Sequence, residues 1–507
     1  MTMADGEQHR IRADLGWLMA GLADAGGASS VESSGLQHDS RRVCPGDLFV
    51  AMAGLHTHGM SHAQEAITRG CAAIAYDPAG EGERLAQGIT DVPAIPVAEL
   101  PAKLGLIADR YFGKPSSRLN VIGITGTNGK TSCSHFLAEA LSGEAPAAAV
   151  GTMGWGVPGN LAPTAHTTPD AIEIHSILHR LERQGFESIA MEASSHGLDQ
   201  GRLNGVRFKN ALYTNFTRDH LDYHGTMAAY LEAKLRLLDW PGLEFVAFNA
   251  DDAELSAAIL RRTPPGIRLI GFSVSGKADL PVPMATVSEL RQGAEGVTFQ
   301  ARFNGQVAAV SAPVFGHFNV ENLAASLTAL LGLGHTVEEA AAALRRVQAV
   351  PGRMERFAGA GRTALVDYAH TPDALHSVLS SLRSHCGGRL WVVFGCGGDR
   401  DRGKRPEMGA IAEKLADKVV VTDDNPRSED GDAIVREILA GCTRDDLATI
   451  RDRRAALEFA LERAGPDDLV LIAGKGHEAT QEIQGQKYPF SDRQVVTEVL
   501  ARLGTAQ

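Results

Sequence analysis

The sequence has few cysteines, no long apolar run and no excess of positive charge. No two of its six cysteines are spaced as Cys-x-x-Cys, which favours neither a disulfide framework nor a zinc ribbon. A membrane-spanning helix needs roughly 18 or more consecutive apolar residues, and no such run occurs. The N-terminal segment mixes charges with apolar residues and lacks the apolar centre of a secretion signal. We therefore expect a cytoplasmic protein that does not insert into a membrane.

The charge balance argues against nucleic acid as the main partner. The chain carries 49 Lys and Arg against 61 Asp and Glu, a net charge of −12. A surface of this sign repels a polyanion, so any phosphate-binding site must be local. The hydrophobic fraction of 44% and the charged fraction of 22% are those of a globular protein, which excludes the disordered and fibrous classes.

The length of 507 residues predicts about three domains at roughly 150 residues each. In the first domain, strand-like runs at 47–51 and 72–76 alternate with glycine turns and a helical stretch near 61–69. A Gly-Lys-Pro-Ser-Ser linker ends it, and a Val-Pro-Gly break follows an alanine-rich helix predicted at 337–347. The resulting domains are 1–116, 117–350 and 351–507.

The last domain has the pattern of a doubly wound parallel sheet. Its apolar, β-branched runs are separated by helical stretches, as alternating strand and helix segments require. In such sheets ligands bind beyond the carboxyl ends of the strands. The runs lie at 363–366, 390–394, 418–421 and 469–472.

A glycine-rich loop follows the apolar run 121–124 and opens a helix near Lys130. Backbone N–H groups and a helix N-terminus in this context cradle phosphate. Lys130 would reach the β and γ phosphates, and the hydroxyl of Thr131 would hold Mg²⁺. Ile124 stands where the strict P-loop has glycine, so the match is to a variant. A turn without a ligand would not explain why strand, loop, Lys-Thr and helix occur together.

A nucleotide site needs further metal ligands, and three candidates follow in the same predicted domain. Glu192 ends an apolar strand, where a carboxylate that binds Mg²⁺ is expected, although a solvated acid is the alternative. His220 and Lys234 lie downstream.

Lys234 falls within an apolar helical stripe. A lysine there usually extends its ammonium to solvent. Burial would instead lower its pKa, and a neutral amine can react with CO₂ to form a carbamate, an anionic ligand for a metal. The stripe consists of Met227, Tyr230, Leu231, Leu235 and Leu238.

Several motifs together resemble the Mur ligases, over a region from Asp39 to Glu478. The resemblance implies an α/β protein with three domains: a small α/β UDP-binding domain, a central P-loop ATPase-like α/β domain and a C-terminal Rossmann-like α/β domain. It also implies ATP-dependent amide-bond formation in peptidoglycan precursor synthesis. The motifs are T-G-T-N-G-K-T (125–131), M-E-A-S-S-H-G (191–197), N-F-T-R-D-H-L-D-Y-H-G (215–225), Y-L-E-A-K (230–234), D-Y-A-H-T-P-D (367–373) and D-N-P-R (424–427).

For the nucleotide and metal, the resemblance implies two Mg²⁺ ions. Thr131 and Glu192 would bind one, and His220 and N6-carboxylated Lys234 the other. Together with Lys130, the last three would be the catalytic residues. The implied ATP-binding residues are Gly126, Thr127, Asn128, Gly129, Lys130, Thr131, Ser132, Asn319, Arg353, Asp367 and His370.

The implied acceptor substrate is UDP-MurNAc-L-Ala-D-Glu. The family often has G-H-x-x-D-G in the first domain, and this chain departs from that pattern at Gly54–Gly59. The matching substrate-binding positions are Ser40, Thr167, Thr168, Ser194, Gln200 and Arg202.

The implied amine donor is meso-diaminopimelate, because D-N-P-R resembles the diaminopimelate-specific branch of the family. Arg427 can clamp a carboxylate and Glu478 can bind an ammonium. A surface salt bridge for Arg427 and a simple turn for Asp424 are the alternatives. The donor-binding positions are Arg400, Asp424, Asn425, Pro426, Arg427, Gly474 and Glu478.

Two other functions compete with this interpretation. Folylpolyglutamate synthase shares the phosphate loop and the carbamylated lysine and also extends a glutamate γ-carboxylate. The D-S-R turn at 39–41 and D-N-P-R argue against it. A protein of another class, an ATP-binding switch, would need no second substrate. We expect the ligase to be a monomer.

Overall fold

The computed structural model describes residues 11–54, 57–164, 166–293, 296–383 and 385–505. The chain forms two compact units. The first holds residues 1–272, 279–283 and 328–334, and the second holds 273–278, 284–327 and 335–507.

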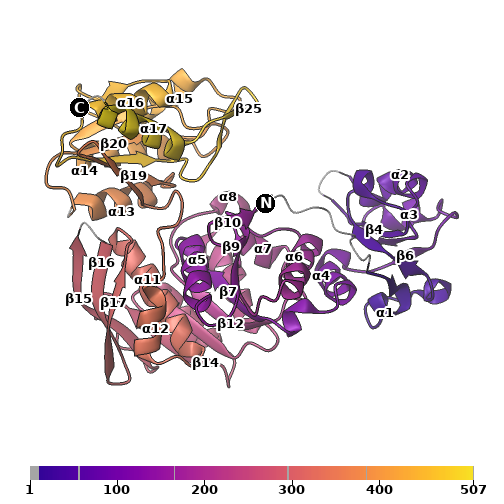
Figure 1. The fold of residues 1–507 in the computed structure, drawn as a ribbon. Helices are drawn as coiled ribbons and strands as arrows, with labels where there is room; N and C mark the ends of the chain where they lie inside the picture. Colours follow the sequence, from indigo (N-terminus) through magenta and orange to yellow (C-terminus); the bar gives the residue numbers. More distant parts are fainter. Residues whose placement is uncertain (1–10, 55–56, 165, 294–295, 384, 506–507) are drawn as a thin grey trace. The chain divides into compact units, whose positions relative to one another are not determined.

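The N-terminal part of the first unit is the small α/β fold expected from the sequence. Four parallel strands pair in the order β3-β4-β5-β6. In β4, Leu48 and Val50 enter one apolar core, and Phe49 enters the other. Helices therefore cover both faces of the sheet, α1 and α4 on one and α2 on the other (Figure 1). The elements are α1 (Leu15–Met19), β3 (Gly35–Gln37), β4 (Asp47–Ala51), α2 (Ala63–Thr68), β5 (Ala73–Tyr76), α3 (Gly82–Ala86), β6 (Ala94–Pro96) and α4 (Leu100–Tyr111).

The first unit also holds a larger sheet in which β7 lies between β11 and β12. In the first unit the strand order is β10-β9-β8-β11-β7-β12-β13-β14, and the six strands β8, β11, β7, β12, β13 and β14 are parallel. Loops that follow β7, β8, β11 and β12 therefore meet at one edge. The strands are β7 (Asn120–Thr125), β8 (Ala147–Gly151), β9 (Gly154–Val157), β10 (Asn160–Ala162), β11 (Ser188–Glu192), β12 (Phe208–Tyr213), β13 (Phe245–Asn249) and β14 (Arg268–Ser273). The helices are α5 (Lys130–Leu141), α6 (Ala171–Arg183), α7 (Ser195–Asp199), α8 (Leu221–His224), α9 (Met227–Leu235) and α10 (Ala253–Arg262).

An antiparallel meander and two helices precede the last sheet. Strands β15 (Met284–Gly293), β16 (Gly296–Phe303) and β17 (Gln306–Ala312) pair in sequence order. Helix α11 (His317–Gly332) follows, then α12 (Val337–Leu344). Thr336 and Glu339 form a capping box at the start of α12. This helix begins where the sequence predicted but ends three residues earlier, at Leu344 rather than Val347.

The C-terminal sheet is doubly wound, as the four apolar runs predicted. Its order is β18-β19-β23-β20-β21-β22, with all strands parallel except the edge strand β18. Crossover helices connect the parallel strands. The elements are β18 (Glu355–Gly359), β19 (Arg362–Asp367), α13 (Pro372–Arg383), β20 (Leu390–Phe394), α14 (Lys404–Leu415), β21 (Lys418–Val421), α15 (Gly431–Leu439), β22 (Ala448–Thr449), α16 (Arg453–Arg463), β23 (Leu469–Ala473), β24 (Thr480–Ile483), β25 (Gln486–Pro489) and α17 (Asp492–Thr505).

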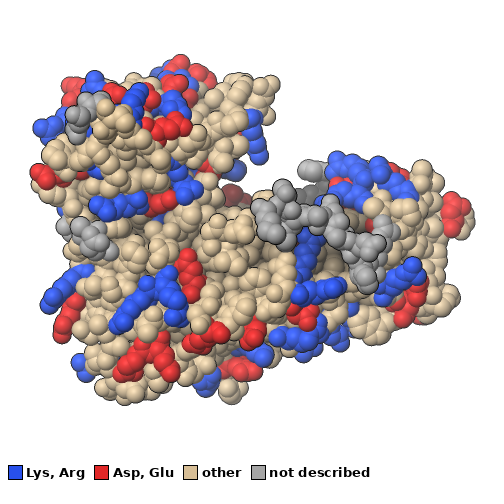
Figure 2. Space-filling view, in the orientation of Figure 1, with Lys and Arg blue, Asp and Glu red and all other residues tan. Residues whose placement is uncertain are grey.

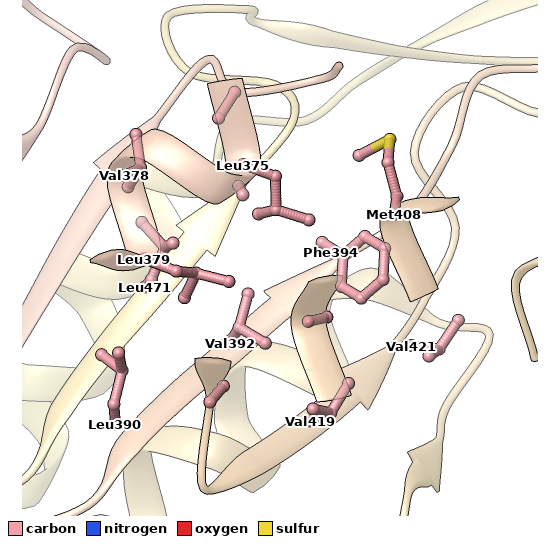
Figure 3. Close-up of a cluster of buried hydrophobic side chains, with 14 of the residues drawn as sticks. Leu375, Val378, Leu379, Leu390, Val392, Phe394, Met408, Val419, Val421 and Leu471 are labelled. Atoms are coloured by element: carbon pink, nitrogen blue, oxygen red, sulfur yellow. The ribbon is translucent and has the colours of Figure 1, made fainter. Parts of the chain in front are cut away.

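Strict alternation along the strands builds a core on each face of this sheet. In β20, Val392 and Phe394 pack beneath α13 and α14, and Figure 3 shows them among Leu375, Leu379 and Met408. The intervening Val393 joins the opposite core, with side chains of α16 and α17. Because successive side chains of a strand point to opposite faces, continuous apolar runs mark a sheet covered on both sides.

On the face drawn in Figure 2, Lys and Arg side chains are interspersed with Asp and Glu side chains rather than gathered into one large field. Within the described ranges, no helix has both the length and the apolar character needed to cross a bilayer.

Candidate active site

The phosphate loop links the buried strand β7 to α5. Gly126 has φ +148°, and a Cβ there would lie 1.9 Å from Oγ1 of Thr214, so this position requires glycine. The Nζ of Lys130 donates to the carbonyl oxygens of Gly126 and Thr127, each over 2.8 Å. The predicted sequence of strand, loop and helix is therefore present, with the lysine directed at the loop.

Other residues fasten this loop to the segment after β12. The N–H of Asn128 donates to Oδ1 of Asn215 over 2.8 Å, and the hydroxyl of Thr214 donates to the carbonyl of Asn128 over 2.6 Å. Gly129 also has a positive φ, of 85°, and Ser132 is buried in the first turn of α5. Hydrogen bonds to the segment after β12 therefore fix the loop, in addition to its own turn geometry.

Glu192 joins three neighbouring strand ends. It lies at the end of β11 and is only 1% exposed. Its carboxylate accepts hydrogen bonds from the hydroxyl of Thr131 at 3.0 Å and from the N–H and hydroxyl of Thr152 at 2.9 and 3.1 Å. A Cβ on Gly151 would lie 2.1 Å from this carboxylate. The alternative of a solvated strand-end acid is therefore wrong.

Lys234 is buried against the phosphate loop. It lies on α9 with 1% exposure, and its Nζ donates to the carbonyl oxygen of Gly126 over 2.7 Å. The same Nζ lies 4.3 Å from the ring centre of Tyr230, whose hydroxyl donates to Oγ1 of Thr127. Burial, with the nearby charge of Lys130, holds the pKa of Lys234 well below its usual value. The alternative in which this lysine extends into solvent is wrong.

His220 lies near the same aromatic ring. Its φ is 52°, its Nε2 is 3.4 Å from Asp219, and its ring centre is 5.9 Å from that of Tyr230. Partial burial lowers the pKa of His220, and the neighbouring His196, whose ring centre is 4.8 Å away, adds to this effect. The structure therefore places Thr131, Glu192, His220 and Lys234 around one loop.

Five of the six residues predicted to bind the muramoyl substrate gather beside β11. The hydroxyls of Thr168 and Ser194 are 2.8 Å apart, and Arg202 donates to the carbonyl of Thr168 and to Oε1 of Gln200. The hydroxyls of Thr167 and Thr152 are 3.1 Å apart, and Thr152 also binds Glu192.

Ser40 lies in the N-terminal sheet domain, where its buried hydroxyl donates to Glu65 over 2.7 Å. In the Gly54–Gly59 loop, residues 55 and 56 lie outside the described residues. A cavity of about 830 Å³ lies along β3 and α6, and none of the predicted muramoyl contacts lines it. The cavity therefore does not coincide with the residues predicted to bind the muramoyl substrate.

Of the nucleotide-contacting residues predicted in the second unit, Arg353 and His370 lie against Tyr368, and Asp367 directly precedes it. The Arg353 guanidinium lies 4.5 Å from its ring centre and the His370 ring 4.6 Å. Asp367 ends β19 and accepts backbone N–H bonds from Met354 and Ala369, each at 2.8 Å. Asn319, in the first turn of α11, donates to the carbonyl of Phe315, which lies two residues before that helix.

Burial raises the pKa of Asp367 against the opposing effect of Arg353. It also lowers the pKa of His370. Burial therefore favours the neutral form of both groups.

The loops after β21 and β23 meet at the carboxyl edge of the C-terminal sheet. Asn425 donates to Oε2 of Glu478 over 2.9 Å, and Lys475 donates to Asn425 and Glu478 over the same distance. Asp424 lies 3.7 Å from Lys475 and is buried, which raises its pKa. The alternative of a simple turn does not account for this buried acid.

The loop after β20 meets the same edge through Gly398, which contacts Arg427 of the loop after β21. Arg427 makes two polar contacts here. Its guanidinium donates to the carbonyl of Gly398 over 2.6 Å and lies 3.7 Å from Glu482. Arg400, in that loop, is exposed. Gly474 has φ +116°, and the carbonyl oxygen of Pro426 accepts a hydrogen bond from the N–H of Glu429. The contacts between the loops confirm that all three converge.

Two residues of these sites were missed by sequence reasoning. Thr152 makes two hydrogen bonds to Glu192, and Lys475 links Asn425 to Glu478. Thr152 directly follows the buried strand β8, and Lys475 lies shortly after the buried strand β23. A rule that considers every polar side chain at the carboxyl edge of a parallel sheet would have found them.

Comparison with known proteins agrees with this geometry. The chain matches the Mur ligase family catalytic domain over residues 32–112, the Mur ligase middle domain over 124–330 and the Mur ligase glutamate ligase domain over 352–476. A UDP-N-acetylmuramoyl-L-alanyl-D-glutamate–2,6-diaminopimelate ligase of Alkalilimnicola ehrlichii is 46% identical over 475 residues, which cover 92% of this chain and 94% of that protein.

Solved structures were also compared with this chain. A UDP-N-acetylmuramoyl-L-alanyl-D-glutamate–2,6-diaminopimelate ligase superposes with a TM-score of 0.71 at 35% identity, covering 97% of this chain and 99% of that chain. A folylpolyglutamate synthase of Mycobacterium tuberculosis complexed with ADP reaches 0.60 at 17% identity, covering 74% and 92%, which is a likeness of fold alone. Three successive domain matches and a relative of this identity over most of both chains show that the protein belongs to the Mur ligase family.

Proposed function

We propose that this protein is an ATP-dependent ligase that adds meso-diaminopimelate to the D-glutamate γ-carboxylate of UDP-MurNAc-L-Ala-D-Glu. The observation that carries the proposal is similarity to diaminopimelate ligases over nearly the whole chain, at 46% identity. The phosphate loop with Lys130 supports the use of ATP. The polar and charged side chains of Asn425, Arg427 and Glu478 support an amino-acid donor.

The reaction must first activate a carboxylate, because an amine does not displace its oxygen. A carboxylate oxygen attacks the γ-phosphorus of ATP, ADP leaves, and an acyl phosphate forms. The donor amine then attacks the acyl carbon, inorganic phosphate leaves from the tetrahedral intermediate, and the nitrogen loses a proton. Lys130 and the loop N–H groups would bind the phosphates and balance the charge that gathers as two anions meet.

The side chains around the loop fit Mg²⁺. Among the described residues, no three His, Cys, Asp or Glu side chains gather closely enough to hold a metal alone. A hard cation prefers oxygen ligands, and the Thr131 hydroxyl and Glu192 carboxylate are hydrogen-bonded to each other at 3.0 Å. These two residues would hold one ion together with phosphate oxygens. Bound Mg²⁺ neutralises charge on the transferring phosphoryl group.

A second ion would use His220 and a carbamate on Lys234. A buried amine with a lowered pKa is the form that reacts with CO₂, and Lys234 is 1% exposed. The carbamate would supply the negative charge that this apolar helix face otherwise lacks. His220 lies within the same group of aromatic and basic side chains.

The substrates are assigned by the chemistry of the two groups of residues. Thr167, Thr168, Ser194, Gln200 and Arg202 offer hydroxyl, amide and guanidinium groups beside Glu192, suited to the muramoyl peptide. In the second unit, Arg427 would clamp the distal carboxylate of diaminopimelate.

The ammonium next to that carboxylate would bind Asp424 and Glu478. Arg400, Asn425, Pro426 and Gly474 would complete this donor site. Ser40 would contact the UDP-sugar from the N-terminal domain.

The test is phosphate release from ATP with UDP-MurNAc-L-Ala-D-Glu and either meso-diaminopimelate, L-lysine or no amino acid. Release with diaminopimelate alone is expected. Equal release with lysine would overturn the donor assignment and keep the ligase. Release without the muramoyl substrate, or with a folate in its place, would overturn the proposal as a whole.

A further inference from the structure

Lys475 is a fully buried lysine in the loop after β23. Its Nζ lies 2.9 Å from Oδ1 of Asn425, 2.9 Å from Oε2 of Glu478 and 3.7 Å from Oδ1 of Asp424. An ammonium removed from water is strongly destabilising unless charges and hydrogen bonds replace its hydration. The three partners supply that replacement, so the lysine and the acids depend on each other.

The lysine fixes the orientation of both loops. Asn425 receives a hydrogen bond from Lys475 and one from the N–H of Glu482 at 3.0 Å on the same oxygen, which directs its amide N–H₂ at Glu478, 2.9 Å away. Removing the lysine would free the side chains of Asn425 and Glu478 to rotate. Such preorganised groups lose less entropy when they bind a ligand.

An unused acceptor lies next to this cluster. Oδ1 of Asp424 is buried and has no hydrogen-bond partner among the residues that the structure describes. A buried carboxylate oxygen without a donor is destabilising, and an ammonium group from a ligand would satisfy it. The cluster therefore has one internal cation and capacity for a second.

Charge explains why an internal cation is needed. Burial raises the pKa of Asp424, whereas Lys475 and Asn425 hold the pKa of Glu478 below its usual value despite burial. Without the lysine, two carboxylates would face each other in a water-poor site and one would take up a proton. The titratable and charged groups facing Glu478 are Lys475, His477, Asp424, Tyr368 and Arg453.

We propose that Lys475 is a positioning residue of the amine-donor site, which holds Asn425 and Glu478 in the arrangement that receives the distal ammonium of the amino acid. This inference rests on the proposed function. Lys475 acts through its neighbours, so its loss should weaken donor binding more than it slows the chemical steps.

The experiment compares Lys475→Met with the unmodified enzyme by phosphate release between pH 6 and 8. We expect the KM for diaminopimelate to rise by about tenfold or more at pH 7.5, with kcat changed by less than about threefold. The KM should rise further towards pH 6, because the pKa of Glu478 increases when its cation is removed and the carboxylate becomes protonated. The KM for ATP should stay constant.

Lys418→Met is the matched control. Lys418 begins β21 at the opposite end of the same parallel sheet and pairs with a single acid, Asp446, at 3.3 Å. Its removal should leave both KM values unchanged.

The inference would be overturned if Lys475→Met and the unmodified enzyme had the same KM for diaminopimelate. It would also be overturned if the variant raised the KM for diaminopimelate and the KM for ATP equally. If the variant does not fold, the unmodified enzyme decides: its KM for diaminopimelate should be constant from pH 8 to 6, and an increase would overturn the inference. Absence of phosphate release by the unmodified enzyme with diaminopimelate would instead contradict the proposed function.

Discussion

The Nζ of Lys234 donates a hydrogen bond to the carbonyl oxygen of Gly126, over 2.7 Å and across 108 positions of sequence. The lysine thus lies under the phosphate loop, next to the ring of Tyr230, and away from solvent. A charged amine is poorly accommodated there, as its lowered pKa shows. This contact leads directly to the first prediction.

Lys234→Ala should abolish ligation, because it removes the group that would carry the carbamate. We expect phosphate release to fall by at least about 100-fold. Added acetate or formate should restore part of the activity by placing a carboxylate in the space left by the side chain. The exposed Lys209 on β12 gives the control variant Lys209→Ala, which should be fully active. A correctly folded Lys234→Ala enzyme that no carboxylic acid rescues would rule out the carbamate.

Glu192→Gln should weaken the metal site without removing the side chain. An amide cannot accept from Thr131 and Thr152 on both of its ends, and it carries no charge for Mg²⁺. We expect the free Mg²⁺ concentration for half-maximal activity to increase by about tenfold or more. Thr152→Val removes one hydrogen bond from Glu192 and keeps its charge, so its Mg²⁺ requirement should change much less. Equal Mg²⁺ curves for all three enzymes would contradict the assignment of Glu192.

Arg427→Ala should act on the amine donor alone. Removal of a bidentate partner for a carboxylate should raise the KM for diaminopimelate by about 10- to 100-fold. The KM for ATP should be unchanged, because Arg427 lies in the loop after β21 and not in the phosphate loop. Arg436→Ala, on the exposed side of α15, is the control. A surface role for Arg427 would leave the two variants indistinguishable.

The buried pair Asp109 and His175 gives a prediction about pH and stability. Nδ1 of His175 is 3.7 Å from Oδ1 of Asp109. Burial lowers the pKa of His175 to about 4 and raises that of Asp109 to about 6. As the pH falls from 6.5 to 4, the unfolded chain protonates its histidine first, which destabilises the fold. Below pH 6 the folded chain protonates Asp109 first, which offsets that loss.

Asp109→Asn should remove this offset, so that the destabilising effect of His175 at low pH can be measured. Its free energy of unfolding, relative to the natural chain, should decrease by about 1.4 kcal/mol per pH unit between pH 6 and 4. Urea unfolding at pH 7, 6, 5 and 4.5 measures this difference. The exposed Asp91 provides a control variant, Asp91→Asn, whose curve should follow that of the natural chain. A constant difference between Asp109→Asn and the natural chain would contradict the two pKa shifts.

Sequence reasoning predicted the elements whose signal is local. The apolar runs of the C-terminal sheet matched β19, β20, β21 and β23 because alternating burial on both faces leaves an uninterrupted apolar strand. The loop before Lys130 was predictable for the same reason, since strand, glycines and helix are contiguous. The end of α12 was misplaced because Arg345 and Arg346 favour helix nearly as much as the alanines before them, so the sequence carries no signal that stops the helix at Leu344.

Residues far apart in sequence were harder to assign. The alternatives for Glu192 and Lys234 stayed open because a sequence does not state burial, which decides both cases. Lys475 was overlooked because a lysine between two glycines looks like a loop residue, and its role depends partly on Asp424 and Asn425, which follow another strand. The pairing of Asp109 with His175 had no local signal at all.

The position of β7 between β11 and β12 also has a consequence for synthesis on the ribosome. The strand that bears the phosphate loop emerges first, yet both of its neighbours follow later, one ending at Glu192 and the other at Tyr213. Until then the nascent chain exposes an apolar strand with two unpaired edges, and such edges promote misfolding and aggregation. Nucleotide affinity should therefore arise late in translation, once Lys234 has emerged and packed beneath the loop.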